Sequence, residues 1–410
     1  MVRFTELPLS PYLQDRLAAA QFVTPMEVQA AAIPHALKGK DILATAQTGT
    51  GKTLAFLVPI MEKLLHNPAA KGVQALVLVP TRELAMQINR QYEQLRGSKL
   101  PAAAVLIGGS SERQQLETLR RGAKLIIATP GRFEDLLDRD LFRVQTVNTL
   151  VLDEADRMLD MGFIPAIRRI VAELPRARQT MCFSATLDPA VAHLVDDYLR
   201  SPVRLAFGST RKASESVELT AYEVQADQKL ALLRRLLERE EGRSLVFVRT
   251  KRATERLGEK LQRAGLRVSV LHGDRSQPQR NKALEAFQQG RSRVLVATDV
   301  ASRGIHVDDV AQVINYDLPA IAEEFIHRVG RTGRAGASGA AATFFTALER
   351  ADLAALERNL QLKIRRARVD GDLVREERSG PVDTSALVPV PVKPGSRMVR
   401  LPGEVLQRHA

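Results

Sequence analysis

Short apolar segments rich in β-branched residues recur along the first half of the chain, and stretches with helical periodicity separate them. In order they are DILATA, ALVLVP, AAVLIG, KLIIATP, TLVLDEA and TMCFSAT. Each has the length of a strand buried on both faces, which is typical of parallel sheets. Strands that alternate with helices predict an α/β domain with a doubly wound, mainly parallel sheet.

The same alternation begins again after a polar interruption. Residues 208–216, GSTRKASES, are small, polar and charged, as is typical of a linker. Further apolar segments follow as SLVFVRT, RVSVLHG, RVLVATD, QVINYD and AATFF. We therefore expect two tandem α/β domains, over residues 1–207 and 217–370.

The composition changes again after about residue 370, where SGPVDTSALVPVPVKPGSRMVRLPGE is rich in proline. Prolines at this density disfavour helices and strands, so we expect an extended or disordered tail over residues 371–410. The basic segment LKIRRARV just before it has two interpretations, the solvated end of a helix or an RNA contact. The tail itself could recruit the protein into a larger assembly.

The net charge of the chain indicates which kind of partner it binds. The chain has 60 lysines and arginines against 47 acids, a formal net charge of +13. This excess favours a polyanion, with nucleic acid ahead of an acidic membrane surface. Aromatic residues make up only 4% and tryptophan is missing, so we expect contacts to the sugar-phosphate backbone rather than base stacking.

The cellular compartment can be inferred from features that the sequence lacks. There is one cysteine, and no apolar run approaches the roughly 20 residues needed to span a bilayer. The N-terminal stretch does not resemble a signal peptide. We expect a soluble cytoplasmic protein that does not enter membranes and acts as a monomer.

A glycine-rich segment, AQTGTGKT at 46–53, follows the apolar DILATA and leads into a helical pattern. A strand, a glycine-rich loop and a helix in this order point backbone N–H groups at a phosphate chain. Lys52 would neutralise the β- and γ-phosphates, and the Thr53 hydroxyl would hold Mg²⁺. The predicted nucleotide-binding residues of this loop are Thr48, Gly49, Thr50, Gly51, Lys52 and Thr53.

Acidic residues follow the apolar segment TLVL, beginning with Asp153 and Glu154. A carboxylate at the carboxyl end of such a strand is where a P-loop enzyme holds its Mg²⁺. Asp153 fits that role through water, and Glu154 could polarise the attacking water. The alternative is a helix N-cap, since acids favour the first turn of a helix.

The arginine-rich segment HRVGRTGR, at 327–334, lies in the second predicted domain. An arginine that reaches a γ-phosphate from outside the phosphate-binding domain is worth about 10³–10⁵ in rate. We therefore predict that Arg331 and Arg334 cross the interdomain cleft to the triphosphate. ATP would then hold the domains together, and hydrolysis would release them.

With these motifs in place, the chain resembles the DEAD-box ATP-dependent RNA helicases, over nearly its whole length to about residue 370. The motifs that carry the resemblance stand in family order: AQTGTGKT, PTREL (80–84), GG (108–109), TPGR (129–132), DEAD (153–156), SAT (184–186), VFVRT (246–250), ATDVASRGI (297–305) and HRVGRTGR. The resemblance implies two RecA-like domains, Mg-ATP hydrolysis and non-processive opening of short RNA duplexes.

The resemblance also implies residue roles. It assigns the coupling of hydrolysis to strand separation to Ser184 and Thr186, and a coupling role fits His327. Short hydroxyls, glycines and arginines at strand-to-helix turns suit phosphate and sugar contacts, with 2′-hydroxyls as the source of RNA preference. The implied RNA-binding residues are Thr81, Arg82, Gly109, Thr129, Gly131, Arg132, Gln277, Arg280, Thr298, Arg303 and Gly304.

Adenine recognition resembles the family's Q motif, in QFVTPMEVQ. Gln29 would bind the adenine edge, and Phe4 and Phe22 are the implied aromatic contacts. Two residues depart from the family pattern, Gln21 where glycine is usual and Met26 where threonine is usual.

A third departure is His306, which stands where many relatives carry an aspartate that helps to hold the ribose. We expect a weaker ribose contact there, with nucleotide affinity that depends on pH near 6–7.

Three rival functions share parts of this pattern. A DNA helicase would use the same two-domain scaffold, and an ATP-gated RNA clamp would use the same residues without separating strands. A P-loop ATPase for small substrates would leave ATDVASRGI and HRVGRTGR without a role. Stimulation by RNA or DNA, and strand separation, discriminate among the three.

Overall fold

The computed structural model describes residues 3–46, 50–186, 189–207, 217–299, 310–333 and 339–369. The predicted linker at 208–216 and the predicted tail at 371–410 lie outside the described residues. The same holds for six predicted site residues: Thr48, Gly49, Arg303, Gly304, His306 and Arg334.

The first domain is built on a seven-stranded sheet in the order β3-β4-β2-β5-β6-β1-β7. Its pairings are parallel. The six predicted strands are present, and a seventh, β7, was not predicted. The bounds are β1 Ile42–Ala46, β2 Ala75–Leu78, β3 Ala104–Leu106, β4 Leu125–Ala128, β5 Thr149–Asp153, β6 Gln179–Ser184 and β7 Val203–Phe207.

Helices cover both faces of this sheet. One apolar cluster packs α1 to α4 on one face, and a second packs α6 to α9 on the other. The bounds are η1 Phe4–Glu6, α1 Pro11–Ala19, α2 Glu27–Leu37, α3 Lys52–His66, α4 Arg82–Arg96, α5 Glu112–Arg120, α6 Pro130–Asp138, α7 Ala155–Asp160, α8 Ile164–Glu173 and α9 Pro189–Tyr198. The single cysteine, Cys182, is fully buried on β6, and burial raises the pKa of its thiol to about 12.

The second domain repeats this architecture with a sheet in the order β10-β11-β9-β12-β13-β8-β14, again with parallel pairings. Its strands are β8 Val217–Glu223, β9 Arg243–Phe247, β10 Val268–Leu271, β11 Val294–Ala297, β12 Val310–Asn315, β13 Gly339–Phe345 and β14 Arg365–Ala367. Its helices are α11 Lys229–Arg239, α12 Lys251–Arg263, α13 Gln277–Gln288, α15 Ala322–Val329, η2 Ala347–Glu349 and α16 Arg350–Leu360.

The basic segment LKIRRARV does not end a helix, so that interpretation was wrong. Its central residues form the edge strand β14, which pairs with β8. Arg365 forms a salt bridge with Glu218 at 2.6 Å, and Arg366 forms one with Glu357 at 2.6 Å. Backbone pairing with β8 therefore decides the conformation here, and an RNA contact stays a prediction.

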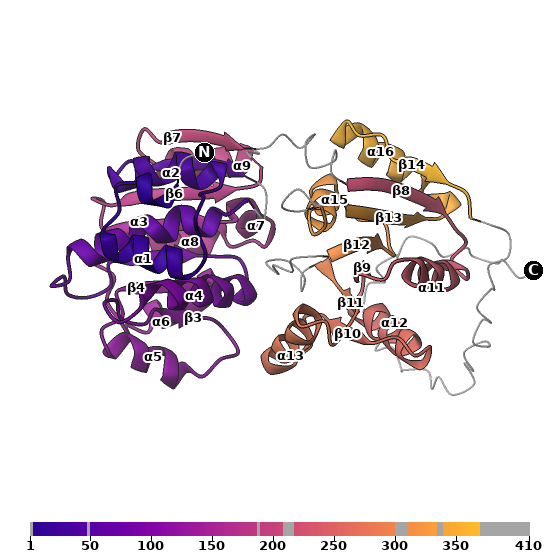
Figure 1. Cartoon of the computed structure of the whole chain (residues 1–410), viewed down its shortest axis with the longest axis horizontal. Coiled ribbons are helices and arrows are strands. Elements are labelled where there is room, and N and C mark those ends of the chain that lie inside the picture. The colour runs from indigo at the N-terminus through magenta and orange to yellow at the C-terminus, as the bar shows by residue number, and fades with distance from the viewer. Residues whose placement is uncertain are drawn as a thin grey trace, which may run out of the picture.

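The strand order places the candidate site. In the first sheet β5, β6 and β1 are neighbours, so the segments that follow these strands meet at one edge of the sheet. The two domains lie side by side, with α7 of the first facing α15 of the second (Figure 1). In the described part of the chain, no helix has the length and apolar character needed to cross a membrane.

Candidate nucleotide site and interdomain interface

The end of the glycine-rich loop forms the start of α3. Gly51 has φ +86°, and a Cβ there would lie 2.3 Å from Nε2 of Gln29, so only glycine fits. Lys52 and Thr53, in the first turn of the helix, are both buried. Within the described residues, Nζ of Lys52 makes no hydrogen bond. A buried ammonium group with its hydrogen bonds unmade fits a site for a phosphate group.

The two acids after β5 are almost fully buried, Asp153 at 2% and Glu154 at 3% exposure. Burial raises the pKa of Asp153 to about 7, although Lys52 opposes the shift. Glu154 has left-handed backbone angles, φ 55° and ψ 52°, and occupies the N-cap position of α7 without a side-chain capping bond. The alternative interpretation of Glu154 as a helix cap therefore has no support in its side chain.

Charges from both domains act on Glu154. Burial opposes ionisation, but Arg157, Lys52 and Arg331 together hold the pKa of Glu154 at about 2. Arg157 donates from Nη1 to Oε2 of Glu154 at 2.6 Å. Glu154 is therefore an ionised carboxylate at the boundary between the domains.

Asp156 joins the DEAD segment to the SAT segment. Its Oδ2 accepts hydrogen bonds from the backbone N–H groups of Ala185 and Thr186, at 2.9 and 3.0 Å. Its own N–H donates to Oγ of Ser184 at 3.3 Å. Ser184 and Thr186, the two predicted coupling residues, are thus held by the turn that carries Glu154. The sequence interpretation gave Asp156 no role of its own, although it is the last residue of DEAD.

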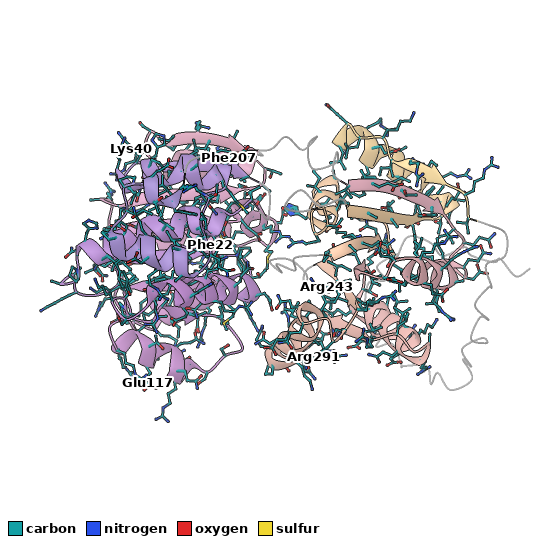
Figure 2. The ribbon with its side chains drawn as sticks, viewed as in Figure 1. Phe22, Lys40, Glu117, Phe207, Arg243 and Arg291 are labelled. Carbon is teal, nitrogen blue, oxygen red and sulfur yellow. The ribbon has the colours of Figure 1, made fainter. Side chains whose placement is uncertain are left out.

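Gln29 joins the Q-motif segment to the glycine-rich loop. Its Oε1 accepts from the N–H of Met26 at 2.9 Å, and its Nε2 donates to the carbonyl of Gly51 at 2.9 Å. Phe4 is buried in the apolar core of the first domain, and Phe22, labelled in Figure 2, packs against the same cluster. The predicted adenine contacts of these three residues stay predictions.

The two arginines of HRVGRTGR that the structure describes, Arg328 and Arg331, have different roles. Arg328 forms a two-pronged salt bridge with Asp299, with both N–O distances 2.6 Å, and also donates to the carbonyl of Asp317. Arg331 is 2% exposed, donates from Nε to the carbonyl of His327 at 3.2 Å, and contributes to the field on Glu154. Arg328 therefore holds the second domain together, and Arg331 faces the first domain.

Three of the predicted RNA-binding residues meet at the domain boundary. Arg280 forms an ion pair with Glu83 at 2.9 Å, and Nε2 of Gln277 donates to the same carboxylate at 3.0 Å. Arg82 lies next to Glu83 and reaches Gln277 at 3.5 Å. The sequence interpretation missed Glu83, although it lies within PTREL.

A groove of about 490 Å³ lies between the domains beside this contact. A Cβ at Gly109 would lie 2.5 Å from Arg82, so the glycine allows this close approach. Thr298 is buried after β11 and does not line the groove. Residues of both domains line it, including two that were not predicted, Gly273 and Arg275. The predicted RNA contacts among them are six: Thr81, Arg82, Thr129, Gly131, Arg132 and Arg280.

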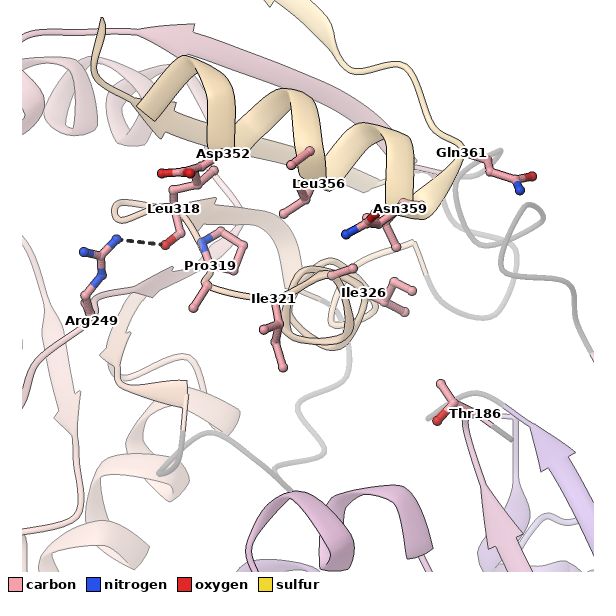
Figure 3. Close-up of a pocket in the computed structure, with 14 residues that line it drawn as sticks. Thr186, Arg249, Leu318, Pro319, Ile321, Ile326, Asp352, Leu356, Asn359 and Gln361 are labelled. Atoms are coloured by element: carbon pink, nitrogen blue, oxygen red, sulfur yellow. Dashed lines mark hydrogen bonds between the residues drawn. The ribbon is translucent and has the colours of Figure 1, made fainter. Parts of the chain in front are cut away.

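A second, larger groove of about 1170 Å³ opens between Thr186 and the second domain. Figure 3 shows Thr186 opposite Ile321 and Ile326, with Arg249 donating to the carbonyl of Leu318 at 3.3 Å. Thr186, the last residue of SAT, therefore lies at the interdomain space, whereas Ser184 is fully buried in the first domain.

Comparison with known proteins agrees with this architecture. The family model for DEAD/DEAH box helicases matches residues 26–194, and the model for the helicase conserved C-terminal domain matches residues 228–336. Among curated proteins, RNA helicase CrhR of Synechocystis is 40% identical over 363 residues, which cover 88% of this chain and 73% of that protein. ATP-dependent RNA helicase RhlB of Xanthomonas oryzae is 40% identical over 398 residues, which cover 95% of this chain and 68% of that protein.

Among solved structures, that of S. cerevisiae Dbp5 bound to RNA and ADP BeF3 matches with a TM-score of 0.80 and 32% identity. The match covers 90% of this chain and 96% of that chain. Two α/β domains with parallel sheets, each matched by a helicase family model, define a two-domain helicase. The chain belongs to the DEAD-box family of ATP-dependent RNA helicases, and the predicted fold class and enzyme class are confirmed.

Proposed function

We propose that the protein is an RNA-dependent ATPase that unwinds or remodels short RNA duplexes, and that ATP closes its two domains on the RNA backbone. The observation that carries the proposal is the convergence of charges from both domains on Glu154. Lys52 and Arg157 come from the first domain and Arg331 from the second. The electrostatic environment of this carboxylate therefore depends on how the two domains are arranged.

ATP and Mg²⁺ fit the residues at the edge of the first sheet. Nζ of Lys52 is buried without a hydrogen bond to any described residue, which suits a phosphate oxygen. Burial raises the pKa of Asp153 to about 7, so this carboxylate would gain from a nearby cation. When bound, Mg²⁺ would supply charge neutralisation between the phosphates, with Asp153 and Thr53 as its protein partners.

Side chains of the protein then have separate roles in ATP hydrolysis. Glu154 orients the attacking water, and its low pKa keeps it in the ionised form that accepts a hydrogen bond. Arg331 stabilises negative charge on the γ-phosphate, with Arg334 as a second predicted contributor. Asp156 carries the state of this turn to Ser184 and Thr186 through the hydrogen bonds described above.

RNA would bind in the groove between the domains that Arg82, Arg132 and Arg280 line. Its arginines and small hydroxyls suit phosphate and sugar oxygens, so binding would not depend on sequence. The matched Dbp5 protein is bound to both RNA and ADP BeF3, which supports a joint RNA and nucleotide state here. We extend the proposal to a monomeric enzyme whose tail recruits it into a ribonucleoprotein or RNA-decay assembly.

The test is steady-state ATP hydrolysis without nucleic acid, with single-stranded RNA and with a DNA of the same sequence. We expect strong stimulation by RNA only, and its loss in Glu154→Gln. A rate indifferent to RNA would overturn the proposal, and equal stimulation by DNA would remove the 2′-hydroxyl preference. Strand separation of a short duplex, measured alongside, separates a helicase from an ATP-gated clamp, which would hydrolyse ATP without opening the duplex.

A further inference from the structure

We propose that Arg157 is a positioning residue that ties the carboxylate of Glu154 to the second domain through the ring of His327. The proposal rests on the proposed function of Glu154 and goes beyond it. It adds a residue that couples contact between the domains to the carboxylate that orients the attacking water.

The first half of the connection lies within α7. Arg157 is 2% exposed, and its Nη1 lies 2.6 Å from Oε2 of Glu154, three residues earlier. This contact engages Oε2 of the carboxylate directly. Glu154 has φ 55°, a strained conformation for a residue with a side chain, so its orientation depends on the groups that hold it.

The second half crosses the domain boundary. Nε of Arg157 lies 3.3 Å from Nδ1 of His327, on α15 of the second domain. A guanidinium group can only donate, so Nδ1 of His327 accepts and carries no proton in this contact. The planar guanidinium thus donates in two directions at once, which a lysine ammonium on a flexible chain does not do with the same geometry.

The same turn of α15 also places Arg331. The carbonyl of His327 accepts a hydrogen bond from Nε of Arg331 at 3.2 Å. The ring of His327 therefore contacts Arg157, while its backbone orients the arginine that acts on Glu154 from the second domain. If the domains separate, Arg157 loses its partner on Nε and Glu154 loses the charge of Arg331 together.

A simpler interpretation is that Arg157 is an ion-pair partner that stabilises the first domain alone. The two interpretations differ in one respect. A role within the first domain makes the effects of changing Arg157 and His327 independent, whereas a connection across the boundary makes them coupled.

The experiment measures kcat and KM for ATP at saturating RNA in Arg157→Gln, His327→Leu and the double variant. We expect each single change to lower kcat by about 10–100-fold, with KM for ATP changed less than about threefold. The double variant should be no slower than the slower single variant. Fold losses that multiply in the double variant would overturn the proposal, as would a full rate in Arg157→Gln.

Conservative variants keep the test decisive if Arg157→Gln does not fold. His327→Asn retains an acceptor near the position of Nδ1 and should restore most of the rate lost in His327→Leu. Arg157→Lys retains a charge for Glu154 without the second donor, so it should remain slow. Equal rates in His327→Asn and His327→Leu, or a full rate in Arg157→Lys, would overturn the proposal.

A matched control is Arg121→Gln, which removes an exposed ion pair with Glu117 on α5 and should leave kcat unchanged. Glu154→Gln separates a failure of the proposed function from a failure of this inference. If RNA does not stimulate the wild-type enzyme, or Glu154→Gln retains its rate, the proposed function fails and this inference with it. If both behave as expected but the Arg157 and His327 effects multiply, only the inference fails.

Discussion

Glu83 of the first domain and Arg280 of the second form an ion pair of 2.9 Å, and their side chains are only 5% and 12% exposed. Gln277 donates to the same carboxylate. Arg280 and Gln277 both belong to the set predicted to bind RNA. Contact between the domains and the predicted contact with the RNA backbone therefore involve the same two side chains.

Replacing Glu83 with glutamine should weaken RNA-induced closure. A hydrogen bond to a charged group contributes about 1.5–3 kcal/mol, and about 1.4 kcal/mol corresponds to a tenfold change in affinity. We expect the RNA concentration that gives half-maximal ATPase stimulation to rise about tenfold. Glu93→Gln on the same helix is the control, because Glu93 pairs with Arg96 within the first domain. An equal rise in both variants would mean that α4 itself had been disturbed.

The two arginines Arg328 and Arg331 should respond in opposite ways to replacement by glutamine. Arg328→Gln removes the buried two-pronged salt bridge to Asp299 and should destabilise the second domain by about 3–5 kcal/mol. Arg331→Gln should lower the RNA-stimulated kcat by about 10³-fold or more, with little change in the unfolding temperature. Thermal unfolding and kcat measured on the same preparations check both. A folded, slow Arg328→Gln with an unfolded Arg331→Gln would reverse the assignment.

Changing Gln29 to glutamate should raise KM for ATP. Glutamate still accepts from the N–H of Met26 but cannot donate to the carbonyl of Gly51, so the glycine-rich loop loses its connection to α2. A loss of about 1.4 kcal/mol predicts a roughly tenfold higher KM. Gln14→Glu provides the control, since its amide donates to Thr5 and Leu7, not to the loop. The prediction is wrong if the two variants raise KM alike.

Gln21→Gly should stabilise the protein. Gln21 has φ +64°, one residue past the C-cap of α1, and Phe22 donates back to the carbonyl of Leu17 as in a Schellman motif. The left-handed conformation costs a residue with a Cβ about 1–2 kcal/mol, and the added freedom of glycine when unfolded offsets about 0.4–1 kcal/mol.

We therefore expect Gln21→Gly to raise the free energy of unfolding by roughly 0.5–1 kcal/mol, measured by thermal or urea unfolding. Ala18→Gly, inside α1, should destabilise by about 1 kcal/mol and gives a control of opposite sign. Two shifts of the same sign would show that the backbone conformation of Gln21 is not what limits stability.

The strands were predictable from sequence wherever they are buried on both faces. DILATA and KLIIATP became β1 and β4, in which every residue except Thr45 is buried. The strand β7 was missed because its residues alternate between half-buried and exposed, so it lacks a continuous apolar run. The strand β14 was missed because arginines dominate it and only its pairing with β8 fixes its shape.

The site was predictable where its residues are neighbours in sequence. Lys52, Asp153 and Glu154 follow from local motifs. The structure also explains why relatives usually carry glycine where this chain has Gln21, because the position follows the end of α1 in the left-handed conformation. The partners across the boundary were not predictable, because no local pattern pairs Glu83 with Arg280. Such contacts depend on how two separately folded sheets meet, which hydrophobic periodicity does not encode.

The burial of Cys182 has a practical consequence. It is the only cysteine of the chain, and a thiol held inside the first sheet with a pKa of about 12 does not form the thiolate that maleimide dyes attack. New cysteines at exposed positions such as Glu117 and Arg291, one in each domain (Figure 2), would therefore take fluorophores without background labelling. Energy transfer between the two dyes would follow domain approach during turnover in an otherwise native chain.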